Sequence, residues 1–155
     1  MTDSKHPAGP FHHLIVLVDG TKASARAVDT SIALALSLGA KLTALVLLET
    51  ETLIQLLNNK FLSKAEMEGL QIDLEENGER LLSEVEVIGK ERGIEIKTAL
   101  VHGNTAQVLP REVDDREADL VVLGAFDTHK ALHDLLARQR LEIVTHSSCP
   151  VLVVR

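Results

Sequence analysis

The sequence predicts an α/β domain, a doubly wound sheet of five parallel strands with helices on both faces. Five short runs rich in valine, leucine and isoleucine alternate with longer segments that have the spacing of amphipathic helices. Most of these runs are continuously apolar, as is typical of strands covered on both faces. Residues that commonly cap helices stand at the junctions between the runs and the helical segments.

The first half of the chain predicts a strand, a helix and a second strand. Residues 14–20 form the first apolar run, which Asp19 and Gly20 close. A helix is expected over residues 21–39, with Thr21 as its N-cap and Gly39 as its C-cap. Residues 40–49 predict a second strand, parallel to the first because the intervening crossover is right-handed. The expected apolar face of the helix comprises Ala25, Val28, Ile32, Ala35 and Leu36.

The second half continues the alternation of helices and strands. Residues 50–62 leave three interpretations open: a linker, a short helix or a surface for a partner. A long helix is expected over 63–92, beginning with a capping box of Ser63 and Glu66, and Gly69 and Gly78 are candidate bends. A strand near the sheet edge (93–103), a helix containing Pro110 (105–117) capped by Asn104, and two last strands (118–125 and 149–155) follow. The apolar stripe of the long helix comprises Leu70, Leu74, Leu81, Val85 and Ile88.

The composition indicates one globular domain and excludes several partners. The 155 residues are 45% hydrophobic, which fits a polar N-terminal tail (1–11) and a single domain (12–155). A formal charge of -7 and an aromatic content of 2% argue against nucleic acid, which needs basic surfaces and stacking platforms. One cysteine, no signal-like segment and no apolar run of roughly 20 residues predict a cytoplasmic protein without direct membrane insertion.

Two strand ends carry the residues most suited to bind a ligand. In open α/β sheets, ligands bind beyond the carboxyl ends of strands where the strand order reverses. Asp19 follows the first strand, and Gly124 ends the fourth. Asp19 can accept hydrogen bonds from a base or sugar, and Gly124 lets a ligand approach the backbone. An equally good interpretation makes Asp19 a turn or helix-start acid, stabilised by the helix dipole.

The chain resembles the universal stress protein family over nearly its full length. The resemblance rests on three segments in the right order and spacing, which are residues 14–49, 102–125 and 146–155. It implies a flavodoxin-like fold with strand order 3-2-1-4-5. It also implies a homodimer joined through the last strand, and an uncovered apolar edge strand at residues 149–155 would favour such pairing.

The resemblance also defines a candidate nucleotide crevice whose motif is degenerate. ATP-binding members have Gly, two residues, Gly, nine residues, then Gly followed by Ser or Thr. Here only Gly124 matches, since Asp127, Ala137 and Arg138 stand at the other positions. Asp127 brings a carboxylate to the phosphate region, where it repels an anion. If the family pattern holds, Asp19 faces adenine and Leu47 packs against the base.

Nearby basic and histidine residues leave alternatives open. Lys130, Arg138 and Arg140 could hold a phosphate, although a solvated helix face is the favoured interpretation. His129 and His133 are four residues apart and could share a metal, but surface or capping histidines are favoured. His12 and His13 are likewise expected to face solvent.

Three classes of function fit these observations unequally. An enzyme is the weakest, because no Walker loop, dinucleotide fingerprint or nucleophile elbow is present, and Cys149 stands at a strand start where nothing activates a thiol. The sequence therefore predicts a non-catalytic stress-response module that dimerises, with weak or absent ATP binding and no required cofactor. The alternative is a regulatory module that binds ATP or another adenine nucleotide through a variant phosphate site.

Overall fold

The computed structural model describes residues 10–49, 58–59, 62–127, 129 and 134–155. Most of the expected N-terminal tail therefore lies outside the described residues, as do Lys130 and His133. The same holds for most of residues 50–62, so the three interpretations of that segment stay open.

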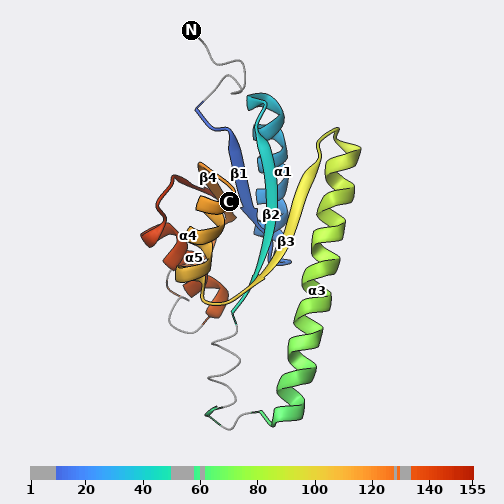
Figure 1. Ribbon diagram of the computed structural model, residues 1–155, viewed down its shortest axis with the longest axis vertical. Coiled ribbons are helices and arrows are strands. Elements are labelled where there is room, and N and C mark those ends of the chain that lie inside the picture. Colours follow the sequence, from blue (N-terminus) through green and yellow to red (C-terminus); the bar gives the residue numbers. More distant parts are fainter. Residues whose placement is uncertain (1–9, 50–57, 60–61, 128, 130–133) are drawn as a thin grey trace.

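The described strands form one parallel sheet in the predicted order (Figure 1). β2 lies between β1 and β3, and β4 lies between β1 and β5. The order 3-2-1-4-5 confirms the predicted fold class, and β3 and β5 are its two edges, as expected. The strands are β1 (His13–Leu17), β2 (Lys41–Leu48), β3 (Ile96–His102), β4 (Leu120–Gly124) and β5 (Val151–Val154).

Helices cover both faces of the sheet. α1 (Lys22–Leu38) and α3 (Lys64–Glu91) bury their apolar residues against one face. α4 (Thr105–Asp115) and α5 (Leu135–His146) cover the other. The first half of α3 extends beyond the carboxyl ends of the strands (Figure 1).

The predicted helix caps are confirmed. Thr21 Oγ1 accepts a hydrogen bond from Ser24 N at 3.1 Å and begins α1. Gly39 ends that helix in the left-handed conformation, with φ of 65°, which glycine adopts at little cost. Ser63 and Glu66 form the expected capping box of α3, and Asn104 caps α4. These signals lie within a few residues of each helix end, so sequence alone reveals them.

The buried face of α1 differs from the expected one. Ala25 and Leu36 are exposed, and Leu36 retains 49% of its accessible surface. Ser24 and Ser31 take their place on the buried face, where the helix lies close to the sheet and small side chains fit. In α3, Gly78 likewise packs against the sheet, since an added Cβ would lie 2.8 Å from Leu100 Cδ1. The buried residues of α1 are Ser24, Ala27, Val28, Ser31, Ile32 and Ala35.

Replacing Ser31 with alanine is expected to stabilise the fold. Ser31 is fully buried, and its Oγ has no hydrogen-bond partner within the described part of the chain. Removing that hydroxyl should raise the free energy of unfolding by about 1 kcal/mol, measured by urea denaturation. Ser24→Ala is the matched control, because Ser24 Oγ donates to Leu17 O and accepts from Asp19 N. Equal destabilisation by both variants would contradict the prediction.

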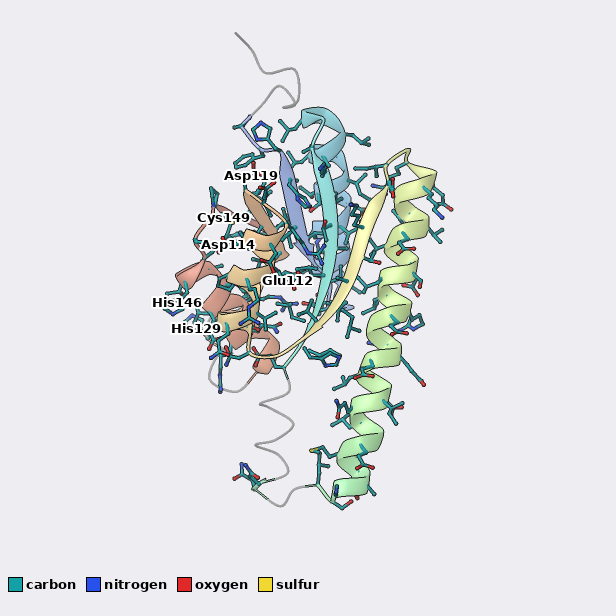
Figure 2. All side chains as sticks on the ribbon, viewed as in Figure 1. Glu112, Asp114, Asp119, His129, His146 and Cys149 are labelled. Atoms are coloured by element: carbon teal, nitrogen blue, oxygen red, sulfur yellow. The ribbon has the colours of Figure 1, made fainter. Side chains whose placement is uncertain are left out.

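The two histidines at the start of β1 are not both solvent-facing, which corrects the expectation. Asp119 accepts hydrogen bonds from the backbone N–H groups of His12 and His13, at 2.8 and 3.1 Å. The half-buried His13 ring donates from Nδ1 to Arg116 O at 2.7 Å and accepts at Nε2 from Thr43 Oγ1 at 2.8 Å. Asp119 lies at the opposite end of the sheet from His129 (Figure 2). The histidine contacts therefore stabilise the end of the sheet where the strands begin, away from Asp19 and Gly124.

The stability of the protein is expected to fall as the pH drops below about 6.5. Burial lowers the pKa of His13 from its ordinary value of 6.5, aided by the positive charges of Lys41 and Arg116, while the Arg116 carbonyl and Asp119 oppose the shift. In this window the unfolded chain binds a proton that the folded chain does not, so stability rises with pH. Urea denaturation at several pH values should show a shallower slope for His13→Gln than for the wild type. Identical slopes would contradict this assignment.

Candidate functional site

Asp19 and Gly124 lie at the point where the strand order reverses. β1 pairs directly with β4 in parallel, so the carboxyl ends of both strands lie at the same end of the sheet. Asp19 follows β1 by two residues, and Gly124 is the last residue of β4. The topology therefore brings these two residues to the same end of the sheet, as their places after two strands predict.

Asp19 begins helix α1 through a local turn. Its Oδ1 accepts hydrogen bonds from Thr21 N at 3.0 Å and from Thr21 Oγ1 at 2.7 Å. Its backbone N–H donates to Ser24 Oγ at 3.1 Å. The structure therefore gives Asp19 the role of a helix-start acid, one of the two interpretations left open. One carboxylate oxygen is committed to that turn, and the other, Oδ2, faces α5.

Arg140 occupies the space beside Asp19 and corrects the expectation of a solvated position. Arg140 is only 7% exposed, and its Nη2 forms an ion pair with Asp19 Oδ2. The same Nη2 donates to Thr21 Oγ1 at 3.4 Å. Burial lowers the pKa of Arg140, but an arginine stays charged under ordinary conditions. Arg138, two residues earlier, is exposed, as a solvated face requires.

Gly124 is packed against the first turn of α1. An added Cβ would lie 2.5 Å from the carbonyl carbon of Ala23 and 2.7 Å from Ser24 N. The backbone that approaches Gly124 is therefore that of α1. This contact alone requires a glycine, whether or not a ligand binds nearby.

In the segment expected to hold phosphates, carboxylates of the chain itself accept hydrogen bonds from backbone N–H groups. Asp134 Oδ1 accepts a hydrogen bond from Ala137 N at 3.4 Å, and Asp134 O accepts from Arg138 N at 3.0 Å. Asp127 is exposed, and its Oδ1 accepts from His129 N at 2.9 Å. Ala137 is buried, with 3% exposure. Asp134 therefore caps α5, a role that was not predicted above, although an Asp three residues before a helical N–H is the usual signal.

A second set of polar contacts links α5 to α4 and β2. Gln139 Nε2 donates to Thr105 Oγ1 at 2.9 Å, and Thr105 Oγ1 donates to the carboxylate of Glu49, which follows β2. Thr105 N also donates to that carboxylate at 3.3 Å. Leu47, the residue expected to face a base, lies in β2. It packs against the hydrophobic cluster beneath α4 and α5, which includes Leu109 and Ile143. Glu49 therefore accepts a hydrogen bond from a backbone N–H in the first turn of α4, as Asp134 does in the first turn of α5.

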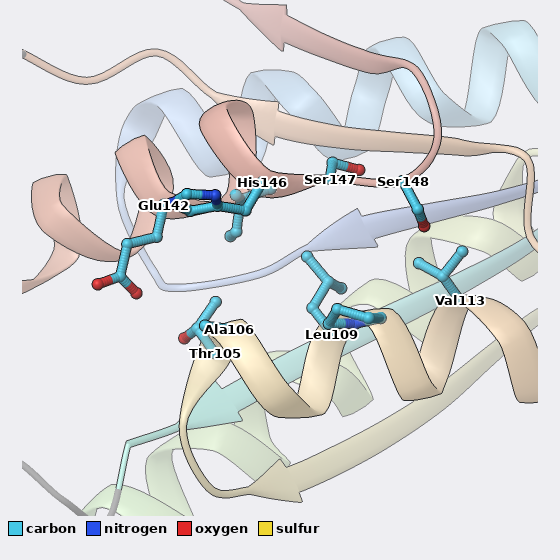
Figure 3. Close-up of a pocket in the computed structure, with 10 residues that line it drawn as sticks. Thr105, Ala106, Leu109, Val113, Glu142, His146, Ser147 and Ser148 are labelled. Carbon is cyan, nitrogen blue, oxygen red and sulfur yellow. The ribbon is translucent and has the colours of Figure 1, made fainter.

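A small pocket lies between α4 and α5 (Figure 3). Thr105, Leu109 and Val113 of α4 form one wall, and Glu142 and His146 of α5 lie across from them. Its volume of about 20 Å³ is far too small for a nucleotide and suits a single water.

The described residues contain neither a metal cluster nor a membrane-spanning helix. Within the described ranges, no group of three or more His, Cys, Asp or Glu side chains has the geometry of a metal site. His129 is exposed there, and its partner in the metal hypothesis, His133, is outside those ranges. None of the helices in the described part of the chain is both long and apolar enough to cross a membrane.

Comparison with known proteins gives consistent similarities. A universal stress protein of Methanocaldococcus jannaschii is 23% identical over 145 residues, covering 94% of this chain and 82% of that protein. A universal stress protein family structure from Burkholderia pseudomallei has a TM-score of 0.72 at 22% identity and covers 96% of this chain and 98% of its own. An Arabidopsis thaliana family structure with AMP bound has a TM-score of 0.64 at 17% identity, covering 92% and 90%. Other similar structures contain cAMP or dAMP.

The sequence model of the universal stress protein family matches residues 10–155, which is nearly the whole chain. The strand order and the similar structures agree with that match. The chain belongs to the universal stress protein family.

Proposed function

We propose that this protein is a non-catalytic, cytoplasmic regulatory module that forms a homodimer and binds ATP weakly or not at all. The observation that carries the proposal is the buried ion pair of Arg140 with Asp19, in which a protein side chain already engages the Asp19 carboxylate near the strand-order reversal. A ligand would have to displace this contact before it could use the Asp19 carboxylate.

The electrostatics of the phosphate segment support the same proposal. A phosphate needs free N–H donors and positive charge, as helix N-termini supply them. At α5 the Ala137 N–H already donates to the Asp134 carboxylate, and Asp127 adds a second negative charge in the same loop. Arg138 is an exposed cation within the described part of this segment, and its side chain has no buried setting that would fix it around a phosphate.

The proposed homodimer uses the β5 edge. Val151 packs with the α4 and α5 cluster, and Val153 extends to the same side of the strand with 40% of its surface exposed. Leu141 and Val144 are further exposed apolar residues of α5. An uncovered apolar edge strand favours pairing with a second copy. Light scattering at micromolar concentration tests this: a dimer is expected, Val153→Lys should weaken it, and a wild-type monomer would refute it.

An adenine-nucleotide-binding regulatory module is the second candidate. It is favoured by the similar structures that contain AMP, cAMP or dAMP. In that case the nucleotide would bind through a variant phosphate site, with Arg138 as a charge partner.

Calorimetric titration with ATP, ADP and AMP, with and without magnesium, distinguishes the two candidates. We expect no submicromolar ATP binding by the wild-type protein. A variant carrying Asp127→Gly, Ala137→Gly and Arg138→Ser, which restores the motif, should bind ATP at least tenfold more tightly. Submicromolar binding by the wild-type protein would instead establish the second candidate.

A further inference from the structure

We propose that Arg140 is a built-in latch on Asp19, so that a small molecule can bind beside this residue only after the guanidinium leaves the carboxylate. This inference rests on the proposed function, because it assigns a means of regulation to the same candidate site. The phosphate segment plays no part in the latch.

The latch is built from contacts between distant parts of the chain. Arg140 comes from α5, whereas Asp19 and Thr21 form the turn between β1 and α1. The Arg140 side chain is 9% exposed and that of Asp19 is 17% exposed, so the pair is largely shielded from water. Because attraction between charges strengthens as water is excluded, this contact is more persistent than a surface ion pair.

The neighbouring residue holds α5 in place independently of the latch. Gln139 donates to Thr105 at the start of α4, and Thr105 is held in turn by Glu49. Two consecutive side chains of α5 therefore contact two different elements: Gln139 contacts the start of α4, and Arg140 contacts the turn between β1 and α1. If Arg140 rotates away from Asp19, the Gln139 contact still anchors the helix. Opening therefore needs a change of one side chain and leaves the fold intact.

The chemistry of the opened site follows from Asp19. Its Oδ1 remains bonded to Thr21, whereas its Oδ2 loses the charged partner that the described residues give it and becomes free to accept from a ligand. Such an acceptor suits a ligand with amino or hydroxyl donors. Adenosine has both kinds of donor and carries no phosphate, so it probes this end of the crevice separately from the phosphate segment.

The test compares adenosine binding by the wild-type protein and two single variants, using calorimetry or NMR titration. Arg140→Ser should bind adenosine at least tenfold more tightly than the wild type. Arg111→Ser is the matched control, since it removes the same charge from an exposed position in α4, and should leave the affinity unchanged. Equal affinities in the wild type and Arg140→Ser, or an equal gain in Arg111→Ser, would overturn the proposal.

A second measurement tests the latch if Arg140→Ser fails to fold. Asp19→Asn keeps the shape of the side chain and removes the charge that holds Arg140. The guanidinium protons of Arg140 should then exchange with solvent at least tenfold faster than in the wild type, and unchanged exchange would overturn the latch. Submicromolar ATP binding by the wild-type protein with an adenosine gain in Arg140→Ser would refute only the proposed function. An absent adenosine gain without ATP binding would refute only the latch.

Discussion

Replacing Gly124 with alanine is expected to lower the free energy of unfolding by about 3 kcal/mol. The added Cβ would lie within 2.5 to 2.7 Å of backbone atoms of Ala23 and Ser24, which have no rotamer to change. The first turn of α1 would have to move away from the end of β4, disturbing a contact between two central elements. Urea denaturation monitored by circular dichroism measures the effect.

Gly69→Ala is the control that separates steric collision from the loss of a glycine. Gly69 lies within α3, and an added Cβ there has no atom within 4 Å. Alanine favours a helix over glycine by up to about 1 kcal/mol, so this variant should be more stable than the wild type. If Gly124→Ala proved as stable as the wild type, the close approach of α1 could not be the reason for a glycine at this position.

The fold was predictable because its signals are local. Most strands are apolar runs, and Thr21, Gly39, Ser63 and Asn104 mark helix ends through hydrogen bonds or backbone angles within a few residues. The buried face of α1 was predicted less well. Hydrophobicity favoured Leu36, whereas the close approach to the sheet selects small side chains, even serines, which sequence patterns count as polar.

The meeting of Asp19 and Gly124 at one end of the sheet was predictable, whereas the side-chain contacts around Asp19 were not. Strand ends located Asp19 and Gly124 at one edge, because the topology of parallel sheets brings such ends together. The role of Arg140 depends on a contact with Thr21, which lies 119 residues earlier in the chain. Sequence alone does not reveal such a contact, because a charged residue in an amphipathic helix usually indicates a solvent-exposed position. His13 was missed for the same reason, since its partners Thr43 and Arg116 come from other elements.

Replacing Arg140 with methionine is expected to lower the free energy of unfolding by about 3 kcal/mol. Methionine keeps much of the buried side-chain volume but leaves the Asp19 carboxylate without its cation in a largely water-excluded setting. Arg138→Met is the matched control, because Arg138 is exposed and its replacement should change stability by no more than about 0.5 kcal/mol. Urea denaturation of the two variants measures the contrast.

A double-mutant cycle then identifies the charge pair as the cause. Asp19→Asn removes the negative charge while its amide oxygen can still accept from Thr21. If Arg140 stabilises the fold through Asp19, the two substitutions should be less damaging together than the sum of their separate effects, by at least about 1 kcal/mol. Because the pair is shielded from solvent, this coupling should change little between low and moderate salt, unlike that of a surface pair. Strict additivity would mean that Arg140 acts only through packing, and the Asp19 carboxylate would then be free to serve a ligand without displacing it.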